Sequence, residues 1–241
     1  MTEALPVAAG ASPFAGVKAC VFDAYGTLFD VASAAARLRD RLGDATVPLA
    51  TLWRDKQLQY TWLRTAQGRH ADFAQVTRDA LGHALEALRL EPSLAGELLS
   101  AFDTLDAFPE VAGVLAEVRA AGLATAVLSN GTPAMLASLL GHAGLAGAFD
   151  AVYSVEAVGA FKPDPRVYAL ACEGLGLSAG QICFLSSNGW DAHGASAFGM
   201  RVAWCNRRGQ PDDRLPGTPD ARIATLAELP GLLAGAGLRR A

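Results

Sequence analysis

The sequence predicts an α/β protein whose core is a doubly wound, Rossmann-like parallel sheet, with an all-helical cap inserted after the first strand. From position 109 onward, short apolar runs alternate with helical stretches of about 10 to 15 residues, which is typical of a parallel sheet covered on both faces. One more apolar run, 17–22, precedes them, whereas 31–108 contains no convincing strand. Of the 241 residues, 51% are hydrophobic, which is enough for a large buried core.

These patterns divide the chain into four regions. Residues 1–16 lack the basic and apolar blocks of a signal peptide, so we expect a flexible leader. The core domain is expected to combine 17–30 with 109–234, and the cap domain to span 31–108. Residues 235–241 are expected to form a tail.

The first element, VKACVFDAYGTLFD, begins at position 17. Its apolar run ends at Phe22 and predicts a buried strand, and Gly26 and Thr27 predict a turn just after Asp23. Ligands of open α/β sheets bind beyond the carboxyl ends of the strands, where Asp23 would lie. The carboxylate is therefore either a nucleophile or an ordinary turn residue, and its position alone does not decide between them.

The next stretch predicts four or five helices, of which 49–66 is the clearest. Its expected buried face follows helical spacing and consists of Leu49, Leu52, Trp53, Lys56, Tyr60 and Leu63. A neighbouring face carries Arg54, Leu58 and Trp62 at intervals of four. From this helix alone, Arg54 is interpreted as a solvated surface charge.

The remaining elements alternate along the chain. We expect helices at 110–121, 133–143, 164–175 and 226–233, and strands at 124–128, 149–154, 181–185, 201–205 and 221–224. Polar residues follow the strands in four loops, which carry Asp23 and Thr27; Ser129 and Asn130; Lys162; and Ser186, Asn188 and Asp191. Because a parallel sheet brings its strand ends to one edge, a carboxylate, an ammonium and several hydrogen-bonding groups should converge there.

Several function classes are excluded by composition. A net charge of −4 without long Lys/Arg clusters argues against a nucleic-acid partner, and no apolar run reaches the roughly 18 residues of a membrane span. Four cysteines without C-x-x-C spacing, three of them in expected strands, predict reduced thiols and a cytoplasmic protein. Scattered histidines predict no zinc site, and we expect no cofactor.

The motifs together resemble the haloacid dehalogenase superfamily, and more narrowly its L-2-haloacid dehalogenase branch. The resemblance rests on DAYGTL from Asp23, SNG from Ser129, KPD from Lys162 with Tyr168, SSNGWD from Ser186, and LWRDKQLQYTWLR in the insertion. It covers about 17–233 and favours the nucleophile over the turn residue at Asp23.

Two positions choose the branch. Phosphatases of this superfamily typically carry acidic metal ligands where this chain has Tyr25 and Ser187. A hard cation such as Mg²⁺ would lose carboxylate ligands there, and attack on carbon needs a bare carboxylate. A Mg²⁺-dependent phosphatase remains the alternative, as does a non-catalytic binder, whose behaviour Asp23→Asn would leave unchanged.

The resemblance implies covalent hydrolysis of a 2-haloalkanoate. Asp23 would displace halide from the α-carbon with inversion, and water would hydrolyse the resulting ester to the D-2-hydroxy acid. Arg54, with Asn130 and Trp190, would receive the halide, which reverses the surface interpretation of Arg54. The resemblance also suggests a homodimer.

The other roles are implied in the same way. Ser129 and Asn188 would orient the substrate carboxylate, beside Lys162. Asp191 would orient or activate the hydrolytic water. Residues expected to fix the nucleophile and Lys162 are Thr27, Tyr168 and Ser186. The apolar wall would consist of Tyr25, Leu58, Phe73 and Trp190.

Two residues depart from the pattern. Asp55 stands where close relatives are expected to carry an amide, so its charge either weakens anion binding or points to solvent. His193 is not a residue of the motif, and we interpret it as a surface histidine on a helix.

Overall fold

The computed structural model describes residues 12–234, and its centre is a parallel sheet of six strands in the order β3-β2-β1-β4-β5-β6. The strands are β1 (Ala19–Phe22), β2 (Ala124–Ser129), β3 (Ala151–Ser154), β4 (Ile182–Ser186), β5 (Arg201–Cys205) and β6 (Ala221–Ile223). From β1 the chain builds β2 and β3 on one side, and then β4 to β6 on the other. The switch in direction falls between β1 and β4, which is where ligands of such sheets bind.

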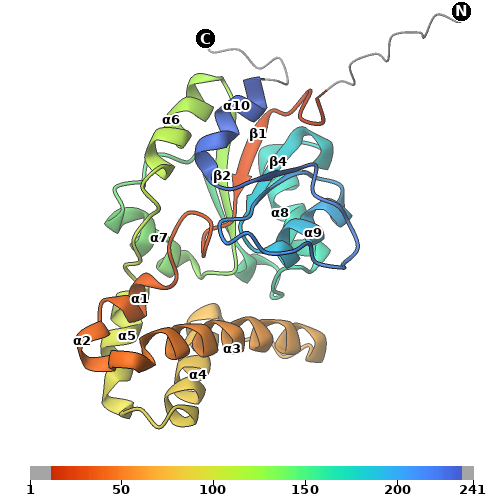
Figure 1. The fold of residues 1–241 in the computed structure, drawn as a ribbon. Coiled ribbons are helices and arrows are strands. Elements are labelled where there is room, and N and C mark those ends of the chain that lie inside the picture. The colour runs from red at the N-terminus through yellow and green to blue at the C-terminus, as the bar shows by residue number, and fades with distance from the viewer. Residues whose placement is uncertain (1–11, 235–241) are drawn as a thin grey trace, which may run out of the picture.

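Helices cover both faces of the sheet, as the alternating pattern predicted. The core helices are α6 (Val111–Ala120), α7 (Pro133–His142), α8 (Pro165–Leu175), α9 (Gly189–Phe198) and α10 (Leu229–Ala234). Helices α6 and α10 pack together on one face, and α8 and α9 on the other (Figure 1). All four residues of β1 are buried between these layers. The doubly wound α/β fold is thereby confirmed.

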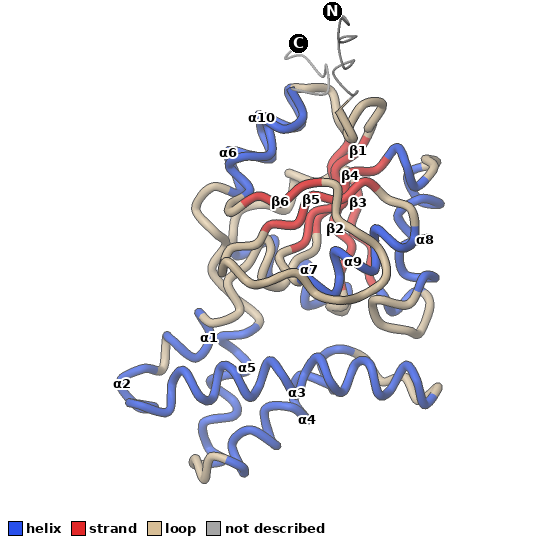
Figure 2. Tube along the Cα trace, turned by 45° about the vertical axis from the view of Figure 1, so that its right-hand side comes forward, coloured by secondary structure: helices blue, strands red, loops and turns tan. Residues whose placement is uncertain are grey.

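The insertion after β1 is helical throughout. It contains α1 (Ser33–Ala36), α2 (Arg39–Leu42), α3 (Thr46–Gln67), α4 (Phe73–Ala87) and α5 (Ala95–Phe102). Short 3-10 turns occur here and in the core, at Gly43–Ala45, Pro92–Leu94, Val155–Ala157, Ala179–Gln181 and Leu226–Glu228. The long helices α3 and α4 pack on each other below the sheet (Figures 1 and 2).

Two chain segments that run side by side join the insertion to the core. The Asp30 N–H donates to the Asp106 carbonyl at 2.8 Å, and the Phe108 N–H donates to the Leu28 carbonyl at 2.9 Å. These bonds hold the two ends of the helical insertion together, next to the loop that follows β1. The insertion therefore lies against the carboxyl ends of the strands (Figure 2).

The buried face of α3 differs from the predicted one. Leu49 and Trp53 are buried as expected, but Gln57 and Thr61 complete the face, whereas Leu63 is 48% exposed. Leu52, Lys56 and Tyr60 are only partly buried. The prediction counted apolar residues, and here buried amide and hydroxyl groups find hydrogen-bond partners inside the cap.

Other expectations also need correction. Phe14, inside the expected leader, is buried in the core, so the packed part of the chain begins before Val17. The rest of the leader, 1–11, and the tail lie outside the described residues. His193 is not a surface residue: it is 5% exposed, and its Nδ1 lies 2.8 Å from the Gly217 carbonyl oxygen.

Helix α9 carries His193, which the sequence analysis expected on a helix without giving that helix any bounds. Its stretch GWDAHGASAF is rich in small residues, so it shows little apolar periodicity. The cysteines do follow the prediction, since all four are free and Cys20, Cys183 and Cys205 are buried. Within 12–234, no helix has the length and apolar character needed to cross a membrane.

Candidate active site

The loop after β1 holds the Asp23 carboxylate at the edge of the sheet. The backbone N–H of Asp23 donates to Leu185 of β4 at 2.8 Å, which continues the strand pairing by one residue. Gly26 has φ +91°, a conformation that favours glycine, and it turns the chain back on itself. Thr27 then donates its hydroxyl to Asp23 Oδ2 at 3.0 Å and accepts a hydrogen bond from the Ser187 N–H at 2.8 Å.

Lys162 is the positive centre of the cluster. Its Nζ lies 3.0 Å from Asp23 Oδ1 and 2.9 Å from Asp191 Oδ2, and its side chain is 1% exposed. Burial lowers the pKa of Lys162, but the two carboxylates outweigh it and leave that pKa raised. The ammonium therefore stays charged and lies against the Asp23 carboxylate.

Asp191 lies behind Lys162 and is fully buried. Its second oxygen, Oδ1, accepts a hydrogen bond from the Tyr168 hydroxyl at 2.8 Å. Burial raises the pKa of Asp191, and the attraction of Lys162 opposes that rise. With one oxygen on Lys162 and the other on Tyr168, Asp191 is placed to hold Lys162. Its expected role at the hydrolytic water would require one of these bonds to open.

Asn188 orients the other side of Asp23. Its Nδ2 donates to Asp23 Oδ2 at 2.9 Å and to the Tyr25 carbonyl at 3.1 Å, so both amide hydrogens are in use. The Asn188 backbone N–H donates to the Ser186 hydroxyl at 3.2 Å. The Ser186 hydroxyl thus shapes this loop, and it forms no hydrogen bond with Asp23 or Lys162. Asn188 positions the nucleophile rather than offering a free donor to a substrate.

Arg54 reaches this cluster from the cap. Its Nη2 lies 3.5 Å from the Tyr25 carbonyl and 3.4 Å from Asn188 Oδ1, and its Nη1 donates to Gln57 Oε1 at 2.8 Å. Burial lowers the pKa of Arg54, and Asp23 acts in the opposite direction. The sequence-based interpretation of Arg54 as a surface charge is wrong, and the one implied by the resemblance agrees with these contacts.

Aromatic rings close the site toward the cap. Tyr25 stacks on Phe102 with ring centroids 5.3 Å apart and lies 5.2 Å from the ring of Phe73. A Cβ on Gly131 would lie 2.9 Å from the Tyr25 hydroxyl, so only glycine leaves room for this ring. Burial raises the pKa of Tyr25, which keeps its hydroxyl neutral.

The loop after β2 supplies Ser129 and Asn130. The Ser129 hydroxyl accepts from the Gly131 N–H at 3.1 Å, and Asn130 Oδ1 accepts from the Lys162 N–H at 3.1 Å. With its oxygen committed to the backbone, Asn130 has its amide hydrogens left as donors. Asn130 is thereby suited to an anion.

Trp190 and Leu58 line hollows beside the cluster. The Trp190 ring meets Trp62 edge-on, with centroids 5.4 Å apart, and both line a hollow of about 550 Å³ that also borders Lys162. Leu58 lines a hollow with Asp55 and Trp62. Of the predicted apolar wall, the rings of Tyr25 and Phe73 are in contact with each other.

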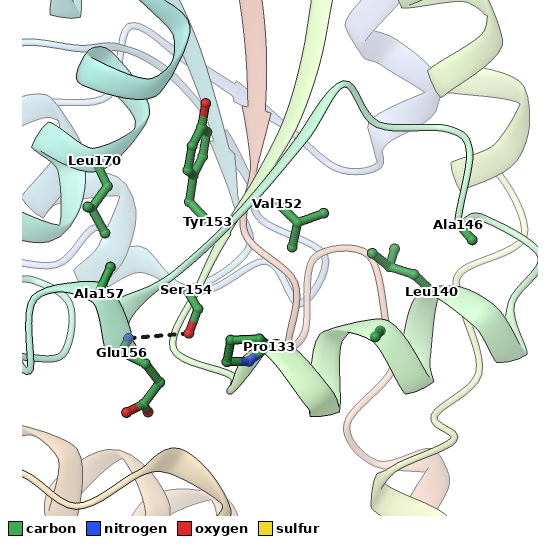
Figure 3. Close-up of a pocket in the computed structure, with 10 residues that line it drawn as sticks. Pro133, Leu140, Ala146, Val152, Tyr153, Ser154, Glu156, Ala157 and Leu170 are labelled. Atoms are coloured by element: carbon green, nitrogen blue, oxygen red, sulfur yellow. Dashed lines mark hydrogen bonds between the residues drawn. The ribbon is translucent and has the colours of Figure 1, made fainter.

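Another hollow, of about 630 Å³, lies beside the edge strand β3 (Figure 3). Val152, Tyr153 and Leu140 line it, and Glu156 lies at one side, where its N–H donates to the Ser154 hydroxyl at 3.2 Å. None of the predicted site residues lines it. Its apolar lining and its distance from the carboxylates separate it from the chemistry.

A Mg²⁺ ion does not fit this donor set. Tyr25 packs its ring between Phe73 and Phe102, and the Ser187 side chain is a neutral hydroxyl. The oxygens of Asp23 and Asp191 already accept hydrogen bonds from side chains of the site. Among residues 12–234, no group of three or more His, Cys, Asp or Glu is arranged to hold a metal ion. Mg²⁺ prefers an octahedral shell of oxygens, which these residues do not offer.

Sequence reasoning assigned no role to four residues that shape the site. They are Gln57, Thr77, Phe102 and Gly131. Gly131 carried a usable signal, because a glycine at a strand end often permits a close approach. Gln57 and Thr77, inside the cap, carried no such signal in the sequence, since glutamine and threonine on a helix are most often exposed.

Comparisons with known proteins agree with this geometry. The family model of haloacid dehalogenase-like hydrolases matches residues 17–199. The chain is 43% identical to (S)-2-haloacid dehalogenase 1 of Pseudomonas sp. (strain CBS-3), over 90% of this chain and 96% of that protein. It is 47% identical to (S)-2-haloacid dehalogenase of Xanthobacter autotrophicus, over 80% and 77%. The structure of L-2-haloacid dehalogenase from Xanthobacter autotrophicus with chloropropionic acid covalently bound superimposes with a TM-score of 0.86, at 40% identity, covering 91% of this chain and 99% of that one.

Proposed function

Because the chain belongs to the haloacid dehalogenase-like hydrolases, we propose that it converts short-chain L-2-haloalkanoic acids to D-2-hydroxy acids through an ester on Asp23. The observation that carries the proposal is the Asp23 carboxylate, paired with Lys162 at 3.0 Å and faced by Arg54 from the cap. The covalent adduct in the Xanthobacter structure supports a covalent route, and the dehalogenase names of the relatives argue against the phosphatase alternative.

In the first step, an Asp23 oxygen attacks the α-carbon from the side opposite the halogen. The new C–O bond forms as the carbon–halogen bond breaks, and the halide leaves with the bonding electron pair. Attack from the opposite side inverts the carbon, so an L substrate gives a D product. Thr27 and Asn188 hold the carboxylate in line, which lowers the entropic part of the barrier.

The substrate brings a further negative charge next to Asp23, and the site meets it with cations and neutral donors. Lys162, paired with Asp23 and Asp191, and Arg54 supply the positive charge. Ser129, whose hydroxyl keeps its hydrogen as a donor, suits one oxygen of the substrate carboxylate. Lys162 stabilises the carboxylate of Asp23 and that of the substrate electrostatically.

The departing halide needs positive charge and hydrogen-bond donors. Arg54 supplies the charge, and Asn130 supplies an amide whose oxygen is already committed to Lys162. Trp190 completes this set as the outermost member. A preorganised donor of this kind typically lowers the barrier by about 3 to 4 kcal/mol.

In the second step, water attacks the carboxyl carbon of the Asp23 ester. The ester C–O bond breaks, the product leaves as the alcohol with one proton of the water, and Asp23 is regenerated as a carboxylate. Lys162, 3.0 Å from Oδ1, stabilises the oxyanion that forms on that carbon. Tyr168 and Asp191 hold Lys162 for this task, and Asp191 accepts the second proton of the water if its bond to Tyr168 opens.

The organisation of the molecule is proposed with the chemistry. Residues 31–108 act as a cap domain over a core domain of 17–30 and 109–234. The homodimer rests on the resemblance of the motifs, and the four free cysteines support a cytoplasmic protein. Molar mass from light scattering in solution tests the dimer, which a monomeric mass would contradict.

Halide release from each enantiomer of 2-chloropropionate, with a chelator present, tests the function. Chloride from the L form alone, with D-lactate as product, is the expected result. A generic phosphate ester with Mg²⁺ is the matched comparison. Phosphate release without chloride release would overturn the proposal.

A further inference from the structure

We propose that Gln57 and Thr77 are positioning residues that aim the guanidinium of Arg54 and leave its positive charge free for an anion. The inference rests on the proposed function, in which Arg54 receives the leaving halide. It concerns two buried cap residues that touch neither Asp23 nor Lys162. Both act through Arg54.

A chain of hydrogen bonds links Arg54 to the backbone of α4. Arg54 Nη1 donates to Gln57 Oε1 at 2.8 Å, and Gln57 Nε2 donates to Thr77 Oγ1 at 2.7 Å. Thr77 in turn donates to the Phe73 carbonyl at 2.7 Å. Gln57 is 0% exposed and Thr77 is 1% exposed, so water does not compete for these bonds.

The direction of this chain is fixed by its last member. A threonine hydroxyl has one hydrogen, and Thr77 gives it to the Phe73 carbonyl, which can only accept. Thr77 must therefore accept from Gln57, and the amide nitrogen of Gln57 must face it. The amide oxygen of Gln57 is left pointing at Arg54. In the reversed orientation, the amide hydrogens of Gln57 would face the guanidinium of Arg54, which can only donate.

Neutral partners keep the charge of Arg54 available. Within residues 12–234, every hydrogen-bond acceptor of Arg54 is a neutral oxygen, belonging to Gln57, to the Tyr25 backbone or to Asn188. A carboxylate at position 57 would form an ion pair in a desolvated site and compete with the halide. The amide holds the guanidinium without that competition.

The two terminal nitrogens of Arg54 are held unequally. Nη1 has one contact, at 2.8 Å, whereas the contacts of Nη2 are 3.4 and 3.5 Å long. Gln57 therefore holds Nη1 by a short hydrogen bond, whereas Nη2 is free to form a shorter hydrogen bond with an incoming anion. The Thr77 carbonyl also accepts from Trp53 Nε1 at 3.0 Å, which locks α3 against α4 at this level.

The first test replaces the amide by a carboxylate. Gln57→Glu keeps the shape, adds a charge beside Arg54 and removes the N–H that donates to Thr77, so we expect chloride affinity, measured by ³⁵Cl line broadening, to fall at least about tenfold. Turnover of L-2-chloropropionate should fall on the order of 100-fold. Turnover of the bromo analogue should fall less, because bromide needs less stabilisation as it leaves. A merely structural role would lower both rates equally.

The second test breaks the chain at Thr77. Thr77→Val should lower turnover about tenfold, and Thr77→Ser, which restores the hydroxyl, should stay within about threefold of the wild type. Thr61→Val is the matched control. It also removes a fully buried hydroxyl from a cap helix, but the Thr61 hydroxyl donates to the Leu58 carbonyl of its own helix. We expect Thr61→Val to leave turnover within about threefold.

The double variant Gln57→Leu/Thr77→Val distinguishes a loss of folding from a loss of the Arg54 orientation. It removes the Gln57–Thr77 bond from both ends, so the group left without its partner is Arg54 Nη1, whose orientation is being tested. We expect it to fold and to show the same weakened chloride binding. Chloride affinity and chloro-to-bromo ratios that match the wild type in Gln57→Glu and in the double variant would overturn the inference alone. A wild type that releases no halide would overturn the proposed function, and the inference with it.

Discussion

The core and the cap build the site in different ways. In the core, Asp23, Asn188 and Lys162 sit on loops after β1, β4 and β3, and side chains or backbone groups hold each of them within about 3 Å. The cap contributes Arg54 from the middle of α3, and its contacts with the core are 3.4 and 3.5 Å long. The Asp23 carboxylate is held by short hydrogen bonds, and the Arg54 guanidinium approaches it from a separate layer.

This difference shows that the sheet topology determines the positions of the site residues in the core, whereas the rotation of α3 determines the position of Arg54. A parallel sheet brings its strand ends to one edge whatever the neighbouring residues are. Arg54 faces the site because of the rotation of α3, which turns Leu49, Trp53 and Gln57 inward. Variants of the core groups should therefore abolish chemistry, and variants of the cap should weaken it by degrees.

The largest effect is expected for Asp23→Asn. An amide is a poor nucleophile, so halide release should fall by at least about 10⁴-fold, while the fold is retained. Halide release under saturating substrate is the measurement. Asp106→Asn makes the same change at an exposed carboxylate that pairs with Arg37, and it should leave the rate within about threefold. Activity of Asp23→Asn within tenfold of the wild type would mean that Asp23 is not the nucleophile.

Lys162→Met tests the buried ion-pair cluster. It leaves Asp23 and Asp191 without their shared cation, so we expect the free energy of unfolding to fall by about 3 to 5 kcal/mol. Chemical denaturation at pH 7 measures the loss. Lys56→Met is the matched control, because the ammonium of Lys56 donates to Gln59 in an exposed hydrogen bond. Equal losses in the two variants would contradict the buried pairing.

The pH dependence of that loss has a definite sign. The pKa of Lys162 is raised in the folded protein, so its stabilisation is fully present below the unfolded value of about 10.4 and is lost as the pH rises through the folded value. The gap in unfolding free energy between wild type and Lys162→Met should stay constant from about pH 7 to pH 10 and narrow above it. A gap that closes below about pH 9 would contradict the raised pKa.

Arg54→Lys should have an intermediate effect. Lysine keeps the charge but cannot hold Gln57 and Asn188 at once, so turnover should fall about 100-fold with the fold intact. Steady-state kinetics with L-2-chloropropionate check this. Arg64→Lys, one surface ion pair farther along α3, should change turnover less than threefold. Comparable losses in both variants would point to the helix rather than to the site.

The smallest effect is expected at Asp55. Its side chain is exposed and lines an outer hollow with Leu58 and Trp62, which favours the solvent-facing interpretation of this unusual acid. Asp55→Asn should change kcat/KM by less than about threefold, and mostly at low salt, because distant surface charges act on encounter and are screened. A salt-independent tenfold gain would instead mean that Asp55 weakens anion binding directly.

The core was predictable because its signals are local and its geometry is imposed. An apolar run followed by a turn predicted β1 and Asp23, and the same pattern predicted the loops with Ser129 and Asn188. Parallel pairing then brings them together, as the register of Phe22 with Val127 and Leu185 shows. The bounds of α9 could not be predicted, because glycine, alanine and serine leave no apolar period.

The cap was harder to predict because its buried face is partly polar. Counting apolar residues favoured Tyr60 and Leu63, yet Gln57 and Thr61 are the residues that turn inward. A glutamine is buried only where a partner waits for it, and that partner, Thr77, lies on a different helix 20 residues away. Such pairing between helices leaves no mark on the local pattern, and for this reason Gln57 was not singled out.

The covalent role of Asp23 is tested most directly by a single turnover in H₂¹⁸O with enzyme in excess over L-2-chloropropionate. If water attacks the carboxyl carbon of an Asp23 ester, mass spectrometry should find ¹⁸O in the peptide that contains Asp23, and the first lactate released should be unlabelled. Label in the lactate, with none in that peptide, would show that water attacks the substrate directly and would contradict the covalent mechanism.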